Sequence, residues 1–164
     1  MSQGQLWPDA VTRDTLAEAR RTVQQGLRMG VVCPCCDKWC KVYRRTIHAE
    51  VAEFLVELVR RHQDTRDWVS ARDIRGGVKA STDAAYLVHW GLVRKKDAQE
   101  RGPRGGLYRP TELGVSFVHG LERVPAWVEL YNNRPVNWAS ERVDVAGALG
   151  RPFEYATTVN PPAP

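Results

Sequence analysis

Hydrophobic residues recur at helical spacing in several stretches of the chain, and these stretches predict its helices. The widest apolar face lies in residues 47–62 and is formed by five side chains, Val51, Phe54, Leu55, Leu58 and Val59. Glu57 and Arg61 stand at i,i+4 on the opposite side, where they can pair. We expect this helix to belong to the core. Weaker patterns predict helices over residues 14–29, 71–75, 82–90, 111–119 and 144–149. In the helix over 111–119 we expect Leu113, Phe117 and Val118 to point inward.

Alternating apolar and polar positions predict short strands between these helices. The pattern occurs at residues 41–45, 68–69, 92–95 and 107–109. The last two flank a loop rich in Gly and Arg, so we expect them to form a hairpin. A second hairpin is expected from residues 126–131 and 136–138, because Asn132 and Asn133 tolerate the positive φ that a tight turn requires. The predicted fold class is therefore α+β.

The composition of the 164 residues is that of a folded domain. Hydrophobic residues make up 43% and charged residues 26%, which argues against disorder and against a coiled-coil rod. The longest apolar stretches have only a few residues, and residues 1–10 lack the basic start and apolar run of a signal peptide. We therefore expect a cytoplasmic protein without a membrane partner.

The net charge of +5 is distributed unevenly. Residues 94–109 carry a net charge of +4, whereas residues 111–164 carry −2. A polarised chain of this kind favours one face for nucleic acid and another for protein. Aromatic side chains on the second predicted hairpin, Trp127, Tyr131 and Trp138, are candidates for the protein face.

Four cysteines fall within eight residues and form the chain's clearest chemical cluster. In a reducing compartment such clustering indicates metal binding before disulfides. Cys33 and Cys36 form a C-x-x-C pair that suits one tetrahedral zinc ion, and Cys40 is the expected third ligand. Either Cys35 or His48 would be the fourth ligand.

We call the cysteine-rich segment over residues 31–46 the knuckle. Two interpretations of it other than zinc binding remain open. The thiols can form a metal-free knuckle, or they can act as a redox switch, because four close thiols allow three full disulfide pairings. Basic side chains follow directly, Lys38, Lys41, Arg44 and Arg45, and they can meet phosphates or solvate an edge strand. No nucleophile, carboxylate pair or phosphate-binding loop stands out in the sequence, so we do not expect an enzyme.

The order of elements over residues 47–120 resembles a winged helix-turn-helix domain. The resemblance extends to Trp90-Gly91-Leu92-Val93 at the end of the third helix and to Tyr108-Arg109-Pro110-Thr111-Glu112-Leu113-Gly114 at the strand-to-helix exit. The whole chain is similar to a group of small bacteriophage and prophage proteins. These share a CPxC knuckle, a basic KxYRR-like stretch, the WGL helix end, and a tail like Val124-Pro125 with Tyr131-Asn132-Asn133.

The predicted elements, together with this resemblance, divide the chain into four parts. Residues 1–30 would form an N-terminal helix, 31–46 the cysteine knuckle, and 47–120 the winged helix-turn-helix. Residues 121–164 would form a hairpin, a short helix and a disordered tail.

The resemblance also implies a DNA-binding site, in which a helix enters the major groove and the hairpin loop contacts the backbone. The residues at the positions of these contacts are Lys79, Ser81, Thr82 and Tyr86 on the helix, Lys95 and Lys96 on the strand, and Arg101 and Arg104 on the wing. Asp83 departs from the pattern, because an acidic group facing phosphates is repulsive. That departure argues against strong sequence-specific binding.

Two functions are consistent with these features. The first is regulatory binding of duplex DNA in a bacterial host cell by a zinc-stabilised winged-helix protein. The second is a protein-docking module that binds, and can inhibit, a host or phage protein. In the predicted helix over residues 14–29, one narrow apolar stripe also allows a homodimer; it is formed by Leu16, Ala19, Val23 and Leu27.

Overall fold

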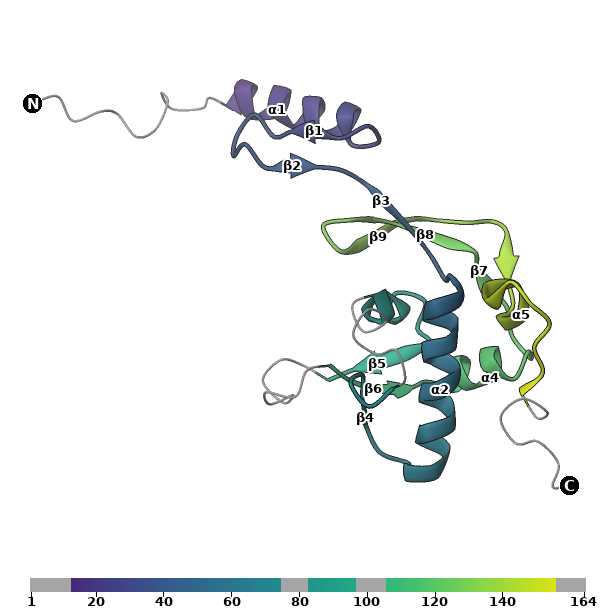
Figure 1. Ribbon diagram of the computed structural model, residues 1–164. Helices are drawn as coiled ribbons and strands as arrows, with labels where there is room; N and C mark the ends of the chain where they lie inside the picture. The colour runs from purple at the N-terminus through teal and green to yellow at the C-terminus, as the bar shows by residue number, and fades with distance from the viewer. Residues whose placement is uncertain (1–12, 75–82, 97–105, 156–164) are drawn as a thin grey trace, which may run out of the picture. The chain divides into compact units, whose positions relative to one another are not determined.

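The computed structural model describes residues 13–74, 83–96 and 106–155, which are coloured in Figure 1. Over these residues the chain is a mixed α+β protein with small antiparallel sheets, which confirms the predicted class. The chain divides into two compact units. Unit 1 comprises Met1–Arg44 and Glu129–Val136, and unit 2 comprises Arg45–Val128 and Asn137–Pro164.

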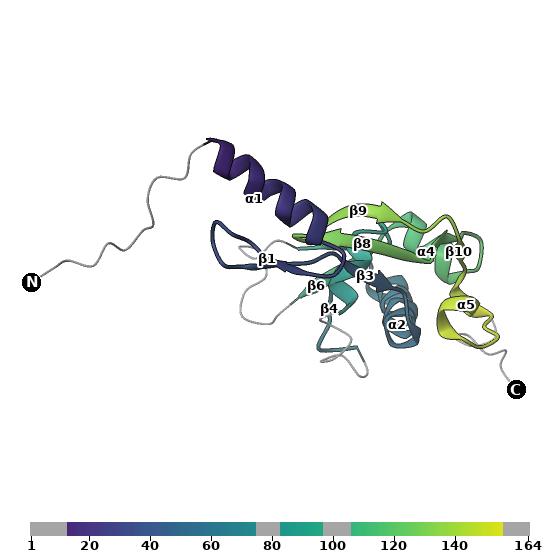
Figure 2. The same ribbon diagram turned by 90° about the horizontal axis from the view of Figure 1, so that it is seen from above.

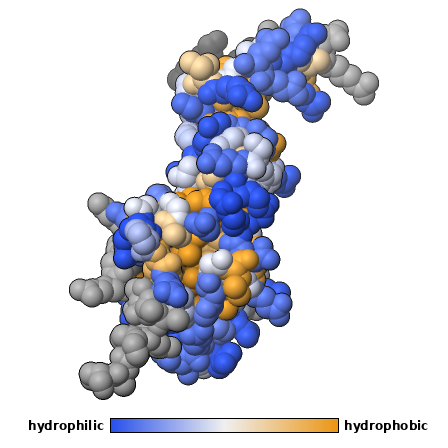
Figure 3. All heavy atoms as spheres, turned by 90° about the vertical axis from the view of Figure 1, so that its right-hand side faces the viewer, coloured by the Kyte–Doolittle hydropathy of each residue, from blue (hydrophilic) through white to orange (hydrophobic). Residues whose placement is uncertain are grey.

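Unit 1 contains helix α1 (Arg13–Gly26) and an antiparallel pair formed by β1 (Val31–Val32) and β2 (Trp39–Cys40). The predicted helix over 14–29 is confirmed, but it ends at Gly26 because the chain turns toward Gly30, whose φ is +97°. Among the described side chains of this unit, the buried hydrophobic ones are Ala19 and Leu130. Hydrophobic side chains of unit 1 are visible at its surface between hydrophilic ones (Figure 3).

Three strands, each with residues in both units, form one sheet in the order β3-β8-β9. They are β3 (Tyr43–Thr46), β8 (Trp127–Tyr131) and β9 (Arg134–Trp138). Asn132 and Asn133 connect β8 to β9 with φ angles of 49° and 58°. The predicted hairpin and its left-handed turn are therefore confirmed.

Unit 2 is built around helix α2 (Ala49–Thr65). All five residues of the predicted apolar face are buried, and Arg61 Nε lies 2.7 Å from Glu57 Oε1, as the i,i+4 spacing predicts. Figures 1 and 2 both show α2 between α5 and the sheet that contains β4, β5 and β6. Helix α2 thus supports most of the unit's core.

The sheet of unit 2 has the order β4-β6-β5, with both neighbouring pairs antiparallel. Its strands are β4 (Val69–Ser70), β5 (Val93–Lys95) and β6 (Leu107–Pro110). The predicted pairing of residues 92–95 with 107–109 is confirmed, while the connecting loop at 97–105 lies outside the described residues.

Two predicted helices differ from the structure. Residues 71–74 form a turn, in which Ser70 Oγ accepts the N–H of Arg72 at 3.3 Å. A helix that ends before Gly76-Gly77 would be very short, and its few hydrogen bonds would not offset the free-energy cost of helix nucleation. The helix expected over 82–90 continues from residues 83–84 as the tighter 3-10 helix η1 (Ala85–Val88) and stops before Gly91, whose φ is +70°.

Helix α4 (Glu112–Val118) follows β6 and begins at the Thr111 cap. Phe117 and Val118 are buried, as predicted, but Leu113 is 37% exposed, so its predicted inward position is wrong. The inward face of α4 is set by Gly114, Phe117 and Val118 at i, i+3 and i+4, and Leu113 precedes this face.

The remaining elements of unit 2 are short. Strands β7 (Val124–Pro125) and β10 (Arg142–Val143) pair antiparallel and lead into helix α5 (Val145–Leu149). Asp144 Oδ1 accepts the N–H of Gly147 at 2.8 Å, and Gly150 ends the helix with a φ of +66°. The predicted helix over 144–149 is thus confirmed. Within the described ranges, no helix combines the length and apolar character needed to cross a membrane.

Candidate nucleic-acid interface and cysteine knuckle

Two arginines lie opposite each other on the exposed face of the β5–β6 hairpin. The register pairs Arg94 with Arg109, and both side chains are exposed. Val93 and Tyr108 alternate with them and are buried on the face toward α2. The alternation that buries the apolar residues therefore forces both guanidinium groups onto the outer face.

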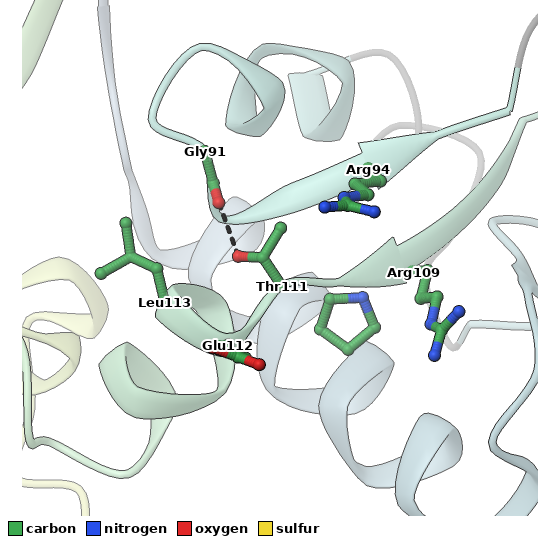
Figure 4. A pocket seen from close by; sticks show the side chains of 7 residues that line it. Gly91, Arg94, Arg109, Thr111, Glu112 and Leu113 are labelled. Atoms are coloured by element: carbon green, nitrogen blue, oxygen red, sulfur yellow. Dashed lines mark hydrogen bonds between the residues drawn. The ribbon is translucent and has the colours of Figure 1, made fainter.

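These arginines line a groove of about 440 Å³ between the hairpin and the start of α4 (Figure 4). Thr111 Oγ1 donates a hydrogen bond to the carbonyl oxygen of Gly91 at 2.6 Å and accepts the N–H of Gly114 at 3.0 Å. These bonds fix the base of the groove. Glu112 also lines it, but neither arginine forms an ion pair with a described acidic residue.

Two further cations lie at the end of β5 and directly after it. Lys95 Nζ lies 5.8 Å from the centre of the Tyr108 ring, and Lys96 Nζ lies 5.6 Å from the centre of the Trp68 ring. An aromatic ring at this distance attracts the ammonium group of each lysine through a cation–π interaction, and the ammonium group can still bind an anion. Both lysines belong to the predicted DNA-binding set, whereas Arg101 and Arg104 lie outside the described residues.

The predicted base-reading helix is described only in part. Lys79, Ser81 and Thr82 lie outside the described residues. Tyr86 is described, and its hydroxyl accepts a hydrogen bond from Arg45 Nη2 at 3.1 Å, while the Arg45 guanidinium lies 4.4 Å from the centre of its ring. Tyr86 is thus occupied by an interaction within unit 2.

Asp83 has a partner that the sequence did not suggest. Its Oδ2 lies 3.5 Å from His48 Nε2, and both side chains are more than 40% exposed (44% for His48 and 43% for Asp83). A protonated His48 would offset the negative charge at the start of this helix. The same contact gives His48 a role in unit 2 other than that of a zinc ligand.

The four cysteines of unit 1 surround a tight backbone turn. The N–H of Cys33 donates to the carbonyl oxygen of Lys38 at 2.8 Å, and the N–H of Asp37 donates to the carbonyl oxygen of Cys33 at 2.9 Å. Asp37 has a φ of +57°, which lets the chain reverse inside the motif. Cys35 and Cys36 are exposed, and Cys33 and Cys40 are half-buried.

The turn directs hydrogen-bond donors at one sulfur. The backbone N–H of Cys35, the side chain of Cys36 and the backbone N–H of Cys36 lower the pKa of the Cys33 thiol, because they stabilise its thiolate. Desolvation and the negative charge of Cys33 raise the pKa of Cys35. Cys40 raises the pKa of the Tyr131 phenol through a side-chain hydrogen bond, to which the charges of Cys33 and Cys36 add.

The donor set suits a soft cation, because four thiols lie within eight residues of the chain. Among the described residues, no three His, Cys, Asp or Glu side chains are already arranged around a common metal position. The knuckle therefore contains four possible metal ligands that are not arranged around one position, and metal binding stays a prediction.

Arg94 and Arg109 are absent from the predicted DNA-binding set, although both lie in the basic segment. The alternation of apolar and polar residues over 92–95 and 107–110 could have identified these two arginines, because it places both on one face once the strands are paired. The sequence pattern does not give the register, however, and the register makes them direct neighbours.

Searches against protein-family models, curated proteins and solved structures gave no match to this chain.

Proposed function

We propose that unit 2 binds duplex DNA through the β5–β6 hairpin as a regulatory protein of the winged-helix kind. Three features support the proposal: the β4-β6-β5 order, α2 packed against β6, and the net charge of +4 on residues 94–109. In a winged helix-turn-helix such a hairpin is the wing that contacts the DNA backbone.

The observation that carries the proposal is the pair of exposed guanidinium groups of Arg94 and Arg109. Like charges directly opposite on neighbouring strands destabilise a sheet. An exposed pair without an acidic partner among the described residues is a suitable receptor for an anion, and planar guanidinium groups match phosphate oxygens especially well. Lys96 follows β5 directly and adds a further positive charge next to this pair, whereas Lys95 is paired with Tyr108 and lies, by the alternation of the strand, on the opposite face.

The described residues favour binding to the phosphate backbone over reading of bases. Tyr86 interacts with Arg45, and Asp83 keeps an acidic group at the start of the base-reading helix. We therefore expect affinity that varies little with sequence and falls steeply with salt. With about four phosphates neutralised, log Kd changes with log salt concentration with a slope of magnitude near ~3.6.

The test is a titration of the full chain against mixed-sequence duplex DNA at several salt concentrations. Arg94→Ala with Arg109→Ala is expected to reduce the magnitude of the salt slope by about 1.8, because each lost phosphate contact removes ~0.9. Arg28→Ala with Arg134→Ala is the matched control, since it removes two exposed arginines from unit 1. No binding at about 50 mM salt and micromolar protein would contradict the proposal.

The predicted wing residues can be tested separately. Arg101→Ala with Arg104→Ala is expected to weaken binding to every duplex sequence by a similar factor, because contacts to phosphates carry no sequence information. Unchanged affinity would exclude the loop from the interface while leaving the Arg94 and Arg109 pair to be judged by its own variant.

Protein docking is a second candidate, and strand β9 supports it. All five residues of Arg134–Trp138 are exposed, including Val136 at 54% and Trp138 at 37%. Exposed apolar and aromatic side chains together suit a protein interface. Val136→Asp is expected to abolish such docking and to leave DNA binding unchanged, which separates the two functions in a pull-down and a DNA titration.

A further inference from the structure

The described residues of unit 1 bury little apolar surface. Among its described side chains the buried hydrophobic residues are Ala19 and Leu130, whereas Met29 is 84% exposed and Trp39 57%. Small units without a sufficient core are usually stabilised by disulfides, metals or oligomerisation. Unit 1 is therefore expected to contain another source of stability.

The cysteine knuckle is arranged to provide it. Backbone hydrogen bonds from the N–H of Cys33 to the carbonyl oxygen of Lys38 and from the N–H of Asp37 to the carbonyl oxygen of Cys33 close a tight turn that contains Cys35 and Cys36. Cysteine ligates metals as the thiolate. Cys35 and Cys36 are exposed and Cys33 is half-buried, so a cation can reach all three thiols from solvent.

Cys40 comes to the same turn from strand β2. Its Sγ lies 3.7 Å from the carbonyl oxygen of Lys38, the oxygen that also accepts the N–H of Cys33. The pairing of Val31 with Cys40 fixes this position on the β1–β2 hairpin. The segment thus brings all four thiols to one short stretch of backbone.

A disulfide would serve this unit less well. A Cys33–Cys36 disulfide closes a very short loop, and the entropic stabilisation by a disulfide increases with loop length. It would also leave Cys40 and strand β2 unattached. A cation shared by the four thiolates joins both ends of the knuckle.

We propose that unit 1 binds one zinc-class divalent cation through Cys33, Cys35, Cys36 and Cys40, and that this ion stabilises the unit in place of a hydrophobic core. The ligands are deprotonated on binding, so each thiol that ligates the cation releases its proton to solvent. The proposal concerns unit 1 and is independent of DNA binding by unit 2.

The first test is elemental analysis of the full chain purified under reducing conditions, followed by titration with Co²⁺ as a spectroscopic probe. About one equivalent of metal and a thiolate-to-cobalt charge-transfer band are expected. Each single Cys→Ser variant is expected to weaken Co²⁺ binding at least tenfold, and His48→Ala is the control that keeps it. Less than a tenth of an equivalent of zinc, iron or nickel without Co²⁺ uptake would overturn the proposal.

A second measurement tests the stability of unit 1 independently of its affinity for metal. The N–H of Val42 donates to the carbonyl oxygen of Leu27 at 2.9 Å, so its hydrogen exchange reports on the packing of unit 1. Chelation is expected to remove its protection while amides of α2 stay protected. Protection that survives chelation, or a Cys33–Cys36 disulfide found by mass spectrometry in metal-free protein, would also overturn the proposal.

Discussion

Arg94 lies directly opposite Arg109 in the antiparallel β5–β6 pair, with both side chains on the exposed face. The fold does not need this pairing, because an opposite-charge pair at these two positions would be more favourable than two arginines. The proposed binding of phosphates would offset the repulsion between the two guanidinium groups. The pairing also allows stability and binding to be changed in opposite directions.

Arg94→Glu is expected to make the protein more stable and a weaker DNA binder. The new carboxylate would face Arg109 across the strands, and a cross-strand pair of opposite charge contributes roughly 0.2–1 kcal/mol. The same carboxylate would repel phosphates. Urea unfolding and DNA titration of one preparation measure both effects.

Arg94→Ala is the comparison for this variant. It is expected to bind DNA more tightly than Arg94→Glu, because it removes a charge without introducing repulsion. Equal or tighter DNA binding by Arg94→Glu than by the parent chain would contradict a role for this face.

Gly114→Ala is expected to destabilise unit 2 by about 1–3 kcal/mol, as overpacking usually does. A Cβ at Gly114 would lie 2.0 Å from the carbonyl oxygen of Leu92, so α4 would have to move away from β5. Ser116→Ala on the same helix is the control and should have a small effect. A Gly114→Ala protein as stable as the parent in urea would show that this close approach is absent.

Thr111→Val is expected to lower stability by about 0.5–2 kcal/mol, the usual cost of losing a helix N-cap. Valine keeps the shape of threonine but loses the bonds to Gly114 N–H and the Gly91 carbonyl oxygen. Thr111→Ser retains the hydroxyl and is expected to stay close to the parent. If the two variants unfold at the same urea concentration, the hydroxyl does not stabilise α4.

Glu57 is expected to make the stability of unit 2 depend on pH in the acid range. Hydrogen bonds from Arg60, and then from Arg61, lower the pKa of its carboxyl from 4.5 to about 2. A pKa lowered by folding contributes stability that is present above 4.5 and is lost as the pH falls through about 2. Partial exposure of both arginines reduces the size of the effect.

Glu57→Gln should therefore destabilise the protein most above the ordinary carboxyl pKa of 4.5, and its difference from the parent should shrink toward about pH 2. Thermal unfolding over this range measures the difference. Arg60→Ala removes the largest cause of the shift and is expected to reduce the pH dependence. A difference that stays constant with pH would contradict the role assigned to Glu57.

Local patterns predicted the elements whose stability is mostly local. Helix α2 has a wide apolar face and α5 has Asp144 and Gly150 at its ends, and both form where expected. The turn at Asn132-Asn133 also depends on the φ preference of its own residues. Shorter segments were predicted less well: residues 71–74 form a turn, and Ala85–Val88 form a 3-10 helix, because marginal helices are decided by their surroundings.

In the candidate sites, too, the features formed by neighbouring residues were predicted and those that join distant residues were not. The clustering of Cys33, Cys35, Cys36 and Cys40 was visible in the chain, because all four lie within one short segment. The pairing of His48 with Asp83 and of Arg45 with Tyr86 was not, since each joins residues distant in sequence.

The sequence by itself determined the α+β class, the core helix α2, the basic hairpin segment and the cysteine cluster. Each of these follows from residues near one another in the chain, where periodicity, charge and spacing act directly. Only the tertiary structure decided that Arg94 faces Arg109, that Leu113 is exposed, and that few described side chains of unit 1 are buried. Those features depend on strand register and on the packing of distant segments, which local patterns do not specify.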